Sequence, residues 1–356
     1  MVSGVEGAEV VFRLDDPEGH LTAVRLWQEL GLPGDSLDFE PVDGGWELRL
    51  PRPTVHRMEY LFQVTGVDGE QATAVDPTNP RVVGGAFGEH SVLELPGYQP
   101  PAWCEAEEVP SRLEPLTVPG TPLGTTVTGQ IWSPDDSEPD EMLPLLVCHD
   151  GPEFAAHAAL TRYVGALVAD DALPRMRLAM LDPGERNTRY AADLDYAATL
   201  TQAVLPAVRD RYATLENVVL MGASLGALAA LHAEWSHPES FAGLFLQSGS
   251  FFTPETDLQE AGFPGFGAIT GFVQRVLAAR AAPSSPAVTL TCGSAEENVH
   301  NNRVMAARLA GFDWDVSFAE SPDVHNFTAW RDTLDPHLTA LLHRVWGQVG
   351  GGEHAA

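Results

Sequence analysis

Lysine is absent from this chain. All 20 basic residues among its 356 are Arg. A chain without Lys cannot form a Schiff base with a carbonyl substrate, and it cannot carry the phosphate-binding Lys of a P-loop. Basic residues are also few beside 50 acidic ones, which gives a net charge of -30. Because such a surface repels polyanions, we expect neither nucleic acid nor an anionic membrane as a partner.

Cysteines and long apolar runs are also scarce. Cys104, Cys148 and Cys292 form neither a disulfide framework nor a CxxC metal motif, and the sequence implies no metal and no organic cofactor. The opening MVSGVEGAEVVFRLDD lacks the basic and apolar regions of a secretory signal. No stretch reaches the roughly 18 apolar residues of a membrane span. We therefore predict a cytoplasmic protein, and the sequence leaves its oligomeric state open.

Residues 1–98 read as short strands separated by clusters of Gly, Pro and Asp. This spacing predicts a first domain that is an immunoglobulin-like β-sandwich. A Pro- and Glu-rich stretch at 99–112 predicts a linker. The predicted strands are AEVVFRL, TAVRLWQEL, GWELRLP, MEYLFQVTG and HSVLELPG.

Residues 113–346 alternate apolar strands with helical periodicity, which predicts a mainly parallel, doubly wound α/β sheet. Ligands of such sheets bind at the carboxyl ends of the strands. Residues 347–356 read as a frayed tail. The predicted strands are TTVTGQIWSP, LPLLVCHD, MRLAMLD, NVVLMG, FAGLFLQSG, AVTLTCG and WDVSFAES, with helices in HAALTRYVGALVADDAL and YAADLDYAATLTQAVLPAVRDRY.

A Gly-x-Ser-x-Gly motif is centred on Ser224. A chain with 33 glycines can produce this motif by chance, but here a buried strand enters it and a small-residue helix leaves it. This context is typical of a nucleophile elbow, whose flanking glycines let the backbone turn sharply. The alternative is that Ser224 is only a small residue in a packing turn.

A serine nucleophile needs a base and an acid. In a sheet with this order of strands the acid follows the serine along the chain, and the histidine base comes last. His325 lies between the last apolar strand and the last helix, where a base can reach across strand ends. The loop after AVTLTCG offers Glu296 and Glu297 as acids, and Asp323 is a third candidate. We favour Glu296, and a Ser–His dyad without a strict acid remains open.

An oxyanion hole needs two N–H donors. Leu225 follows the nucleophile directly, and CHDGPEF offers Gly151 for the second donor. Pro152 has no N–H, so Gly151 or Glu153 would have to supply it.

The stretches LLVCHDGPEF, GASLGALAALHAEWSHPESFAGLFLQSGSFF and VHNFTAWRDTL carry a family resemblance. Over roughly residues 113–346 the chain resembles the esterase family that includes enterochelin (ferric enterobactin) esterases, esterase D and mycolyltransferases. The resemblance implies an α/β-hydrolase fold, with Ser224 as nucleophile, Glu296 as acid and His325 as base. TCGSAEENVHNNRVMAARL is similar to the family's Gly-x-x-Glu loop and Asn-bearing helix.

The chain departs from the family pattern at three positions. Pro152 stands where the family usually supplies an oxyanion N–H, Asn326 where it often has Asp, and Ala227 where it has a second Gly. The N-terminal part is similar to an early-set domain, which enterochelin esterases also carry. YLFQVTGVDGEQATAVDPTNP also resembles glycogen-binding early-set modules, which occur in some feruloyl and acetyl esterases of polysaccharides.

Arg and aromatic residues follow several predicted strands. Together they suit an anionic, aromatic ester such as a ferric catecholate siderophore, because Arg binds anions and stacks on rings. The alternative is that Arg186 and Arg189 only form surface ion pairs. The candidate substrate-binding residues are Arg186, Arg189, Tyr190, Phe251, Phe252, Trp330 and Arg331, the last two matching a Trp-Arg pair of the family.

The prediction is a serine carboxylic-ester hydrolase that cleaves catecholate siderophore esters through an acyl-enzyme. One alternative is a feruloyl or acetyl ester hydrolase acting on a carbohydrate ester, with a sugar-binding-like N-terminal module. Another is a non-catalytic binding protein on a hydrolase scaffold, in which Pro152 marks a degenerate oxyanion hole. In each enzymatic case the expected partner is a small-molecule ester.

Overall fold

The structure, a computed structural model, describes residues 3–85 and 88–347. Its chain forms two compact units. The first comprises Met1–Pro100 together with two later segments, Gly293–Glu297 and Pro322–Ala329, and the second contains the remainder. The predicted tail at 347–356 lies, from residue 348 onward, outside the described residues.

The first unit contains two antiparallel sheets with a common core. One sheet has the order β1-β2-β5-β4, and the other has the order β3-β6-β9-β8, with β7 paired to β6. Side chains such as Phe12 and Leu48 of the first sheet and Leu26 and Phe62 of the second are buried in one cluster. The strands are β1 (Gly4–Glu6), β2 (Glu9–Asp15), β3 (Leu21–Gln28), β4 (Glu40–Val42), β5 (Gly45–Pro51), β6 (Arg57–Gly66), β7 (Gln71–Ala74), β8 (Val82–Gly85) and β9 (Gly88–Glu94).

The DPTNP stretch has a structural role in this unit. The Asp76 carboxylate accepts hydrogen bonds from the Tyr60 hydroxyl at 2.8 Å and from the Thr78 N–H at 2.8 Å. The Asn79 amide donates to the Val92 carbonyl at 2.8 Å. These residues therefore hold the turn after β7.

The second unit is built on an eight-stranded sheet with the order β10-β11-β13-β12-β14-β15-β16-β17. The five strands from β13 to β16 pair in parallel, whereas β10 and β11 are antiparallel. The predicted α/β-hydrolase sheet is thus confirmed. The strands are β10 (Ser111–Val118), β11 (Val127–Pro134), β12 (Leu145–Cys148), β13 (Arg177–Leu181), β14 (Val219–Ala223), β15 (Gly243–Gln247), β16 (Ala287–Gly293) and β17 (Val316–Ser321).

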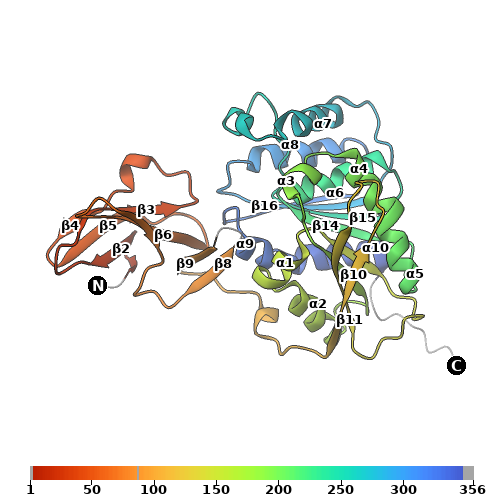
Figure 1. Ribbon diagram of the computed structural model, residues 1–356, viewed down its shortest axis with the longest axis horizontal. Helices are drawn as coiled ribbons and strands as arrows, with labels where there is room; N and C mark the ends of the chain where they lie inside the picture. Colours follow the sequence, from red (N-terminus) through yellow and green to blue (C-terminus); the bar gives the residue numbers. More distant parts are fainter. Residues whose placement is uncertain (1–2, 86–87, 348–356) are drawn as a thin grey trace. The chain divides into compact units, whose positions relative to one another are not determined.

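Helices lie on both sides of this sheet (Figure 1). Successive residues of β12 and β14 are all buried, although their side chains alternate between the two faces. The helices are α1 (Gly151–His157), α2 (Leu160–Ala169), α3 (Arg186–Arg189), α4 (Leu194–Thr199), α5 (Leu205–Arg211), α6 (Leu225–Ser236), α7 (Phe266–Ala278), α8 (Val299–Ala310), α9 (Phe327–Asp332) and α10 (Thr339–Trp346). Short 3-10 or π segments are Gly34–Ser36, Ala102–Glu105, Leu200–Val204, Leu258–Gly262 and Leu334–Leu338.

Two elements differ from the sequence prediction. Strand β10 begins at Ser111, inside the stretch predicted as linker, and it contains Pro115. Because β10 is an edge strand of its sheet, it tolerates a residue that cannot donate to a ladder. The helix predicted over 190–212 is divided into α4 and α5 by a π segment, which ends just before Pro206.

Candidate active site

Ser224 occupies a strained turn between β14 and α6. Its φ of 57° and ψ of -122° lie outside the regions that residues with a side chain normally adopt. Every residue of β14 is buried, so the preceding strand is fixed in the sheet. A Cβ added to Gly222 would lie 2.5 Å from the Gly226 carbonyl carbon. The two glycines of the motif are therefore required for the turn, as a nucleophile elbow demands.

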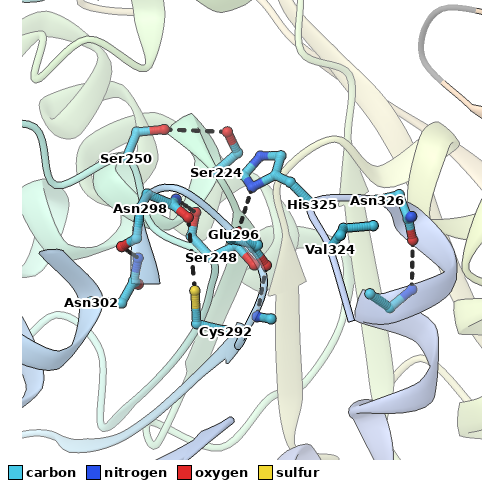
Figure 2. A network of polar contacts seen from close by, with 12 residues as sticks. Ser224, Ser248, Ser250, Cys292, Glu296, Asn298, Asn302, Val324, His325 and Asn326 are labelled. Atoms are coloured by element: carbon cyan, nitrogen blue, oxygen red, sulfur yellow. Dashed lines mark hydrogen bonds and ion pairs between the residues drawn. The ribbon is translucent and has the colours of Figure 1, made fainter. Parts of the chain in front are cut away.

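The backbone of Ser224 is also bonded to the end of the neighbouring strand. Its N–H donates to the Gln247 carbonyl at 2.9 Å, and its carbonyl accepts from the Ser250 N–H at 3.2 Å. The hydroxyls of Ser224 and Ser250 lie 3.2 Å apart (Figure 2). Ser250 was not among the residues predicted from the sequence, although it lies in the SGSFF stretch that carried the family resemblance.

Two asparagines of the α8 region hold the turn that carries Ser250. The Asn302 amide accepts from the Gly249 N–H at 2.8 Å and donates to the Gly249 carbonyl at 3.0 Å. Asn298 donates to the Ser248 carbonyl at 3.0 Å. The Asn-bearing helix was noticed in the sequence, but its partner turn lies about fifty residues away and could not be identified from spacing.

His325 and Glu296 form a hydrogen-bonded pair (Figure 2). The His325 Nδ1 atom lies 2.7 Å from a Glu296 carboxylate oxygen, and the other oxygen accepts from the Gly293 N–H at 2.7 Å. The Glu296 side chain is 1% exposed and the His325 side chain 38% exposed. With a carboxylate at Nδ1, the proton belongs on that nitrogen and the lone pair on Nε2. This is the geometry of an oriented base.

The other two candidate acids lie in different surroundings. Glu297 is exposed. Asp323 is buried and forms an ion pair with Arg57. The geometry therefore favours Glu296 among the three alternatives.

The three candidate catalytic residues follow strands of one sheet. Ser224 comes directly after β14, Glu296 follows β16 by three residues, and His325 follows β17 by four. Strands β14, β15 and β16 are parallel, so their carboxyl ends share one edge of the sheet. Glu296 and His325 belong to segments of the first compact unit, whereas Ser224 belongs to the second.

The candidate oxyanion donors lie at the starts of two helices. Leu225 is the first residue of α6 and Gly151 the first of α1, and N–H groups in a first turn have no acceptor within their helix. A Cβ on Gly151 would lie 2.4 Å from Met180, which explains why this position is glycine. Pro152 is the second residue of α1, where proline fits the helix geometry at the loss of one potential donor.

A buried histidine joins these two helix starts. The His149 Nδ1 atom lies 3.0 Å from the Gly226 carbonyl, and burial lowers the pKa of His149 to about 3. The imidazole is therefore neutral and donates its Nδ1 proton to that carbonyl. The sequence analysis gave His149 no role, since a buried contact with the helix behind the nucleophile leaves no sequence signal.

The predicted substrate-binding residues divide into core and surface groups. Tyr190 and Phe251 are 0% and 1% exposed, and Trp330 is 7% exposed with its indole N–H donating to the Ser248 hydroxyl at 2.9 Å. These three rings are therefore buried, and their predicted place in a substrate site stays a prediction. Phe252 is only partly buried.

The predicted arginines are engaged in polar contacts. Arg186 forms two hydrogen bonds with the Asp150 carboxylate, at 2.9 and 3.0 Å. Burial opposes its charge, but Asp150 outweighs burial and raises the pKa of Arg186. Arg189 donates to the Thr125 hydroxyl at 3.3 Å, and Arg331 pairs with Asp332 at 2.7 Å. Arg186 thus forms an ion pair with a buried carboxylate, and its predicted role in substrate binding stays a prediction.

Among residues 3–85 and 88–347, no cluster of three or more His, Cys, Asp or Glu side chains is arranged to bind a metal ion. Within the same ranges, no helix has the length and apolar character needed to cross a membrane.

The parallel sheet, with a strained serine between its central strand and the next helix, defines an α/β-hydrolase. A family model with the description "Putative esterase" matches residues 120–341. Since this match covers more than half of the chain, the chain belongs to that esterase family. The class of enzyme is therefore an ester hydrolase.

The comparisons also found individual relatives. The chain is 24% identical over 280 residues to the iron(III) enterobactin esterase of Escherichia coli K12, a match covering 75% of this chain and 66% of the relative. The chain thus spans just under two thirds of that relative. The ferric enterobactin esterase structure from Salmonella typhimurium has a TM-score of 0.77 at 21% identity, covering 94% of this chain and 93% of that one.

An enterobactin esterase structure from Shigella flexneri, determined in the presence of enterobactin, has a TM-score of 0.73 at 20% identity. It covers 95% of this chain and 92% of that one. These structures share the fold of this chain.

Proposed function

We propose that this chain is a serine esterase that hydrolyses catecholate siderophore esters. The observation that carries the catalytic part is the strained Ser224 turn, because a folded chain retains such strain where function requires it. The His325–Glu296 pair follows the serine in the chain order of α/β-hydrolases, which supports the same assignment.

In the proposed mechanism the Ser224 hydroxyl attacks the ester carbonyl carbon while His325 Nε2 accepts its proton. Glu296 stabilises the imidazolium that forms, through its bond to Nδ1. The N–H groups of Leu225 and Gly151 stabilise the negative oxygen of the tetrahedral intermediate. The intermediate collapses when the C–O bond breaks and His325 protonates the leaving alcohol. Water then repeats these steps on the acyl-enzyme, which releases the acid and restores Ser224.

The substrate part of the proposal rests on the relatives. The E. coli relative is an iron(III) enterobactin esterase, and the S. flexneri structure was determined in the presence of enterobactin. Among the predicted substrate residues, Arg186, Arg189, Phe252 and Arg331 are only partly buried and retain exposed surface. Tyr190, Phe251 and Trp330 are buried. We place the reaction in the cytoplasm as part of the same proposal, which cell fractionation tests.

The test uses two steps. Wild type and Ser224→Ala are first treated with a fluorophosphonate probe and assayed with a short p-nitrophenyl ester. We expect labelling and turnover of the wild type alone. Absence of both in the wild type would contradict the enzyme assignment and favour a binding protein on this scaffold.

The second step separates the substrates. The wild type is incubated with cyclic and linear catecholate esters, with and without bound Fe(III), and the products are separated by chromatography. Release of catechol-serine units supports the siderophore proposal. Turnover of feruloyl or acetyl sugar esters, with none of the catecholate esters, would replace it with the carbohydrate-ester alternative.

A further inference from the structure

The first compact unit contains more than the N-terminal β-sheets. It includes Gly293–Glu297 and Pro322–Ala329, the segments that carry the candidate acid and base. The two segments are bonded to each other by the Ala295 N–H, which donates to the Asp323 carbonyl at 3.1 Å. The contacts of these segments with the sheets can therefore determine how the base is held.

Arg57, at the start of β6, forms a buried ion pair with Asp323. The side chains are 3% and 1% exposed. The second Asp323 oxygen accepts from the Val324 N–H at 3.0 Å. Next to it, the His56 N–H donates to the Pro322 carbonyl at 2.6 Å. The backbone just before His325 is thus fixed by the first residues of one strand of the sheet.

The backbone just after His325 is held by two carboxylates. Asn326 donates from Nδ2 to Glu29, which follows β3, at 3.2 Å. Thr328 donates to Glu59 of β6 at 3.2 Å, and both side chains are buried. The Ala329 N–H donates to the Asn326 Oδ1 atom at 2.9 Å, so the Nδ2 atom must face Glu29.

These contacts account for the departure at Asn326. An aspartate there could still accept the Ala329 N–H, but it would place a second carboxylate against Glu29. Glu29 already lies close to Glu59, whose other oxygen contacts His90 at 3.1 Å. Asparagine has the same shape as aspartate, but its Oδ1 accepts from the Ala329 N–H while its Nδ2 donates to the Glu29 carboxyl group.

We propose that Arg57, Glu29 and Glu59 are positioning residues for the catalytic base, so that the β-sheets of the first unit are a working part of the esterase. Arg57 fixes the chain before His325, and Glu29 and Glu59 fix the chain after it. Together they keep His325 Nδ1 on Glu296. This inference rests on the proposed function, in which His325 is the base.

The electrostatic setting agrees with this role. Burial, and next the charge of Glu59, raise the pKa of Glu29 to about 7, while the Asn326 amide and the charge of His325 lower it. The hydrogen bond to the Glu59 carboxylate raises the pKa of His90. Above about pH 7 Glu29 is ionised, and its negative charge then favours the imidazolium that His325 becomes during each half-reaction.

The test is an exchange of the Glu29–Asn326 pair in the full chain. Asn326→Asp replaces the amide donor with a carboxylate, and at pH 8, where Glu29 is ionised, we expect kcat to fall about tenfold, the loss expected for a hydrogen bond to a charged group. Glu29→Gln on its own should lower kcat only about threefold, because Gln still accepts from Asn326. The double variant Glu29→Gln/Asn326→Asp restores a donor facing a carboxylate and should return kcat to within about threefold of the wild type.

The matched control is Glu47→Gln in the same unit. Glu47 pairs with Arg13 at 2.8 Å, and kcat should stay within about twofold of the wild type. The pH profile of kcat/KM should shift for Asn326→Asp and return in the double variant, a response that simple loss of stability would not give. If Asn326→Asp folds and leaves kcat and this profile unchanged, or if Glu29→Gln does not reverse its effect, the proposal is wrong.

A second measurement separates this inference from the proposed function. The imidazole nitrogen shifts of His325, observed by NMR, report the bond to Glu296 whether or not the chain turns over an ester. We expect Asn326→Asp to change them and the double variant to restore them. A wild type without esterase activity that still shows this pattern would refute the function and retain the positioning role. Unchanged shifts would refute the positioning role.

Discussion

Ser224 and His325 are held in place by different means. Ser224 lies in a turn fixed by backbone bonds and by the small volume of Gly222 and Gly226. His325 lies in a segment fixed by side chains, among them Arg57 and Glu29, that are more than 260 residues away in sequence. The difference shows that one candidate catalytic residue depends on local geometry and the other on long-range polar contacts.

Substitutions near Ser224 and near His325 should therefore reduce activity in different ways. A change near Ser224 should act by steric conflict within a few residues. A change that weakens the support of His325 should act through charge, and a compensating charge should reverse it.

Ser224→Ala should reduce ester hydrolysis by roughly 10⁴-fold or more, because no other group can form the acyl-enzyme. The neighbouring Ser250→Ala removes a hydroxyl only 3.2 Å away and should cost about tenfold or less, since it takes no part in covalent chemistry. Single-turnover kinetics with a p-nitrophenyl ester measure both. Equal losses in the two variants would contradict the assignment of Ser224 as nucleophile.

Gly222→Ala should reduce activity by about 10²-fold and destabilise the fold by about 2–4 kcal/mol, because the new methyl group would meet backbone at 2.5 Å. The matched control is Gly267→Ala on the exposed start of α7, where a Cβ would meet no atom within 4 Å. The control should be neutral or up to about 1 kcal/mol more stable. Activity and urea unfolding are measured for both. A harmless Gly222→Ala would show that the turn can relax.

The contrast also explains what could be predicted from the sequence. The serine turn was predictable because its strand, its glycines and its helix are contiguous, and the alternation of strands and helices fixed the hydrolase sheet. Strand β10 was missed because Pro115 and its Pro- and Glu-rich flank are typical of a linker. The burial of Tyr190, Phe251 and Trp330 was not predicted, because sequence position gives the strand end but not the direction of the ring.

The support of His325 could not be predicted for a related reason. Arg57, Glu29 and Glu59 belong to a part of the chain with no local pattern that marks them, and they contact the base segment only through the tertiary fold. The one available signal was Asn326, which differs from the residue often found in the family. Its meaning depends on Glu29, which no spacing rule connects to it.

Arg57→Met should destabilise the chain by about 3–5 kcal/mol, because Asp323 would keep a buried charge without its cation. The double variant Arg57→Met/Asp323→Leu should recover much of this loss, since neither charge remains. The control is Asp38→Asn, which breaks the exposed Arg25–Asp38 pair, 40% and 61% exposed, and should cost about 1 kcal/mol or less. Denaturant unfolding compares the three. Equal effects of Arg57→Met and Asp38→Asn would show that the segment before His325 does not depend on the buried ion pair.

Glu29→Gln should change how stability depends on pH. The pKa of Glu29 is raised from 4.5 to about 7, first by burial and then by Glu59, so between these pH values the folded chain keeps a proton that the unfolded chain releases. The contribution of this group to stability is therefore full below the lower pKa and is lost as the pH rises through the higher one. Gln cannot ionise, so the variant should gain about 2–3 kcal/mol relative to the wild type between pH 5 and pH 8. Thermal unfolding at the two pH values measures this gain, with Glu47→Gln expected to show none.

A pH response that is the same in Glu29→Gln and wild type would mean that Glu29 ionises freely. Arg57 and Asp323 would then be the remaining evidence that charged side chains hold the segment around His325.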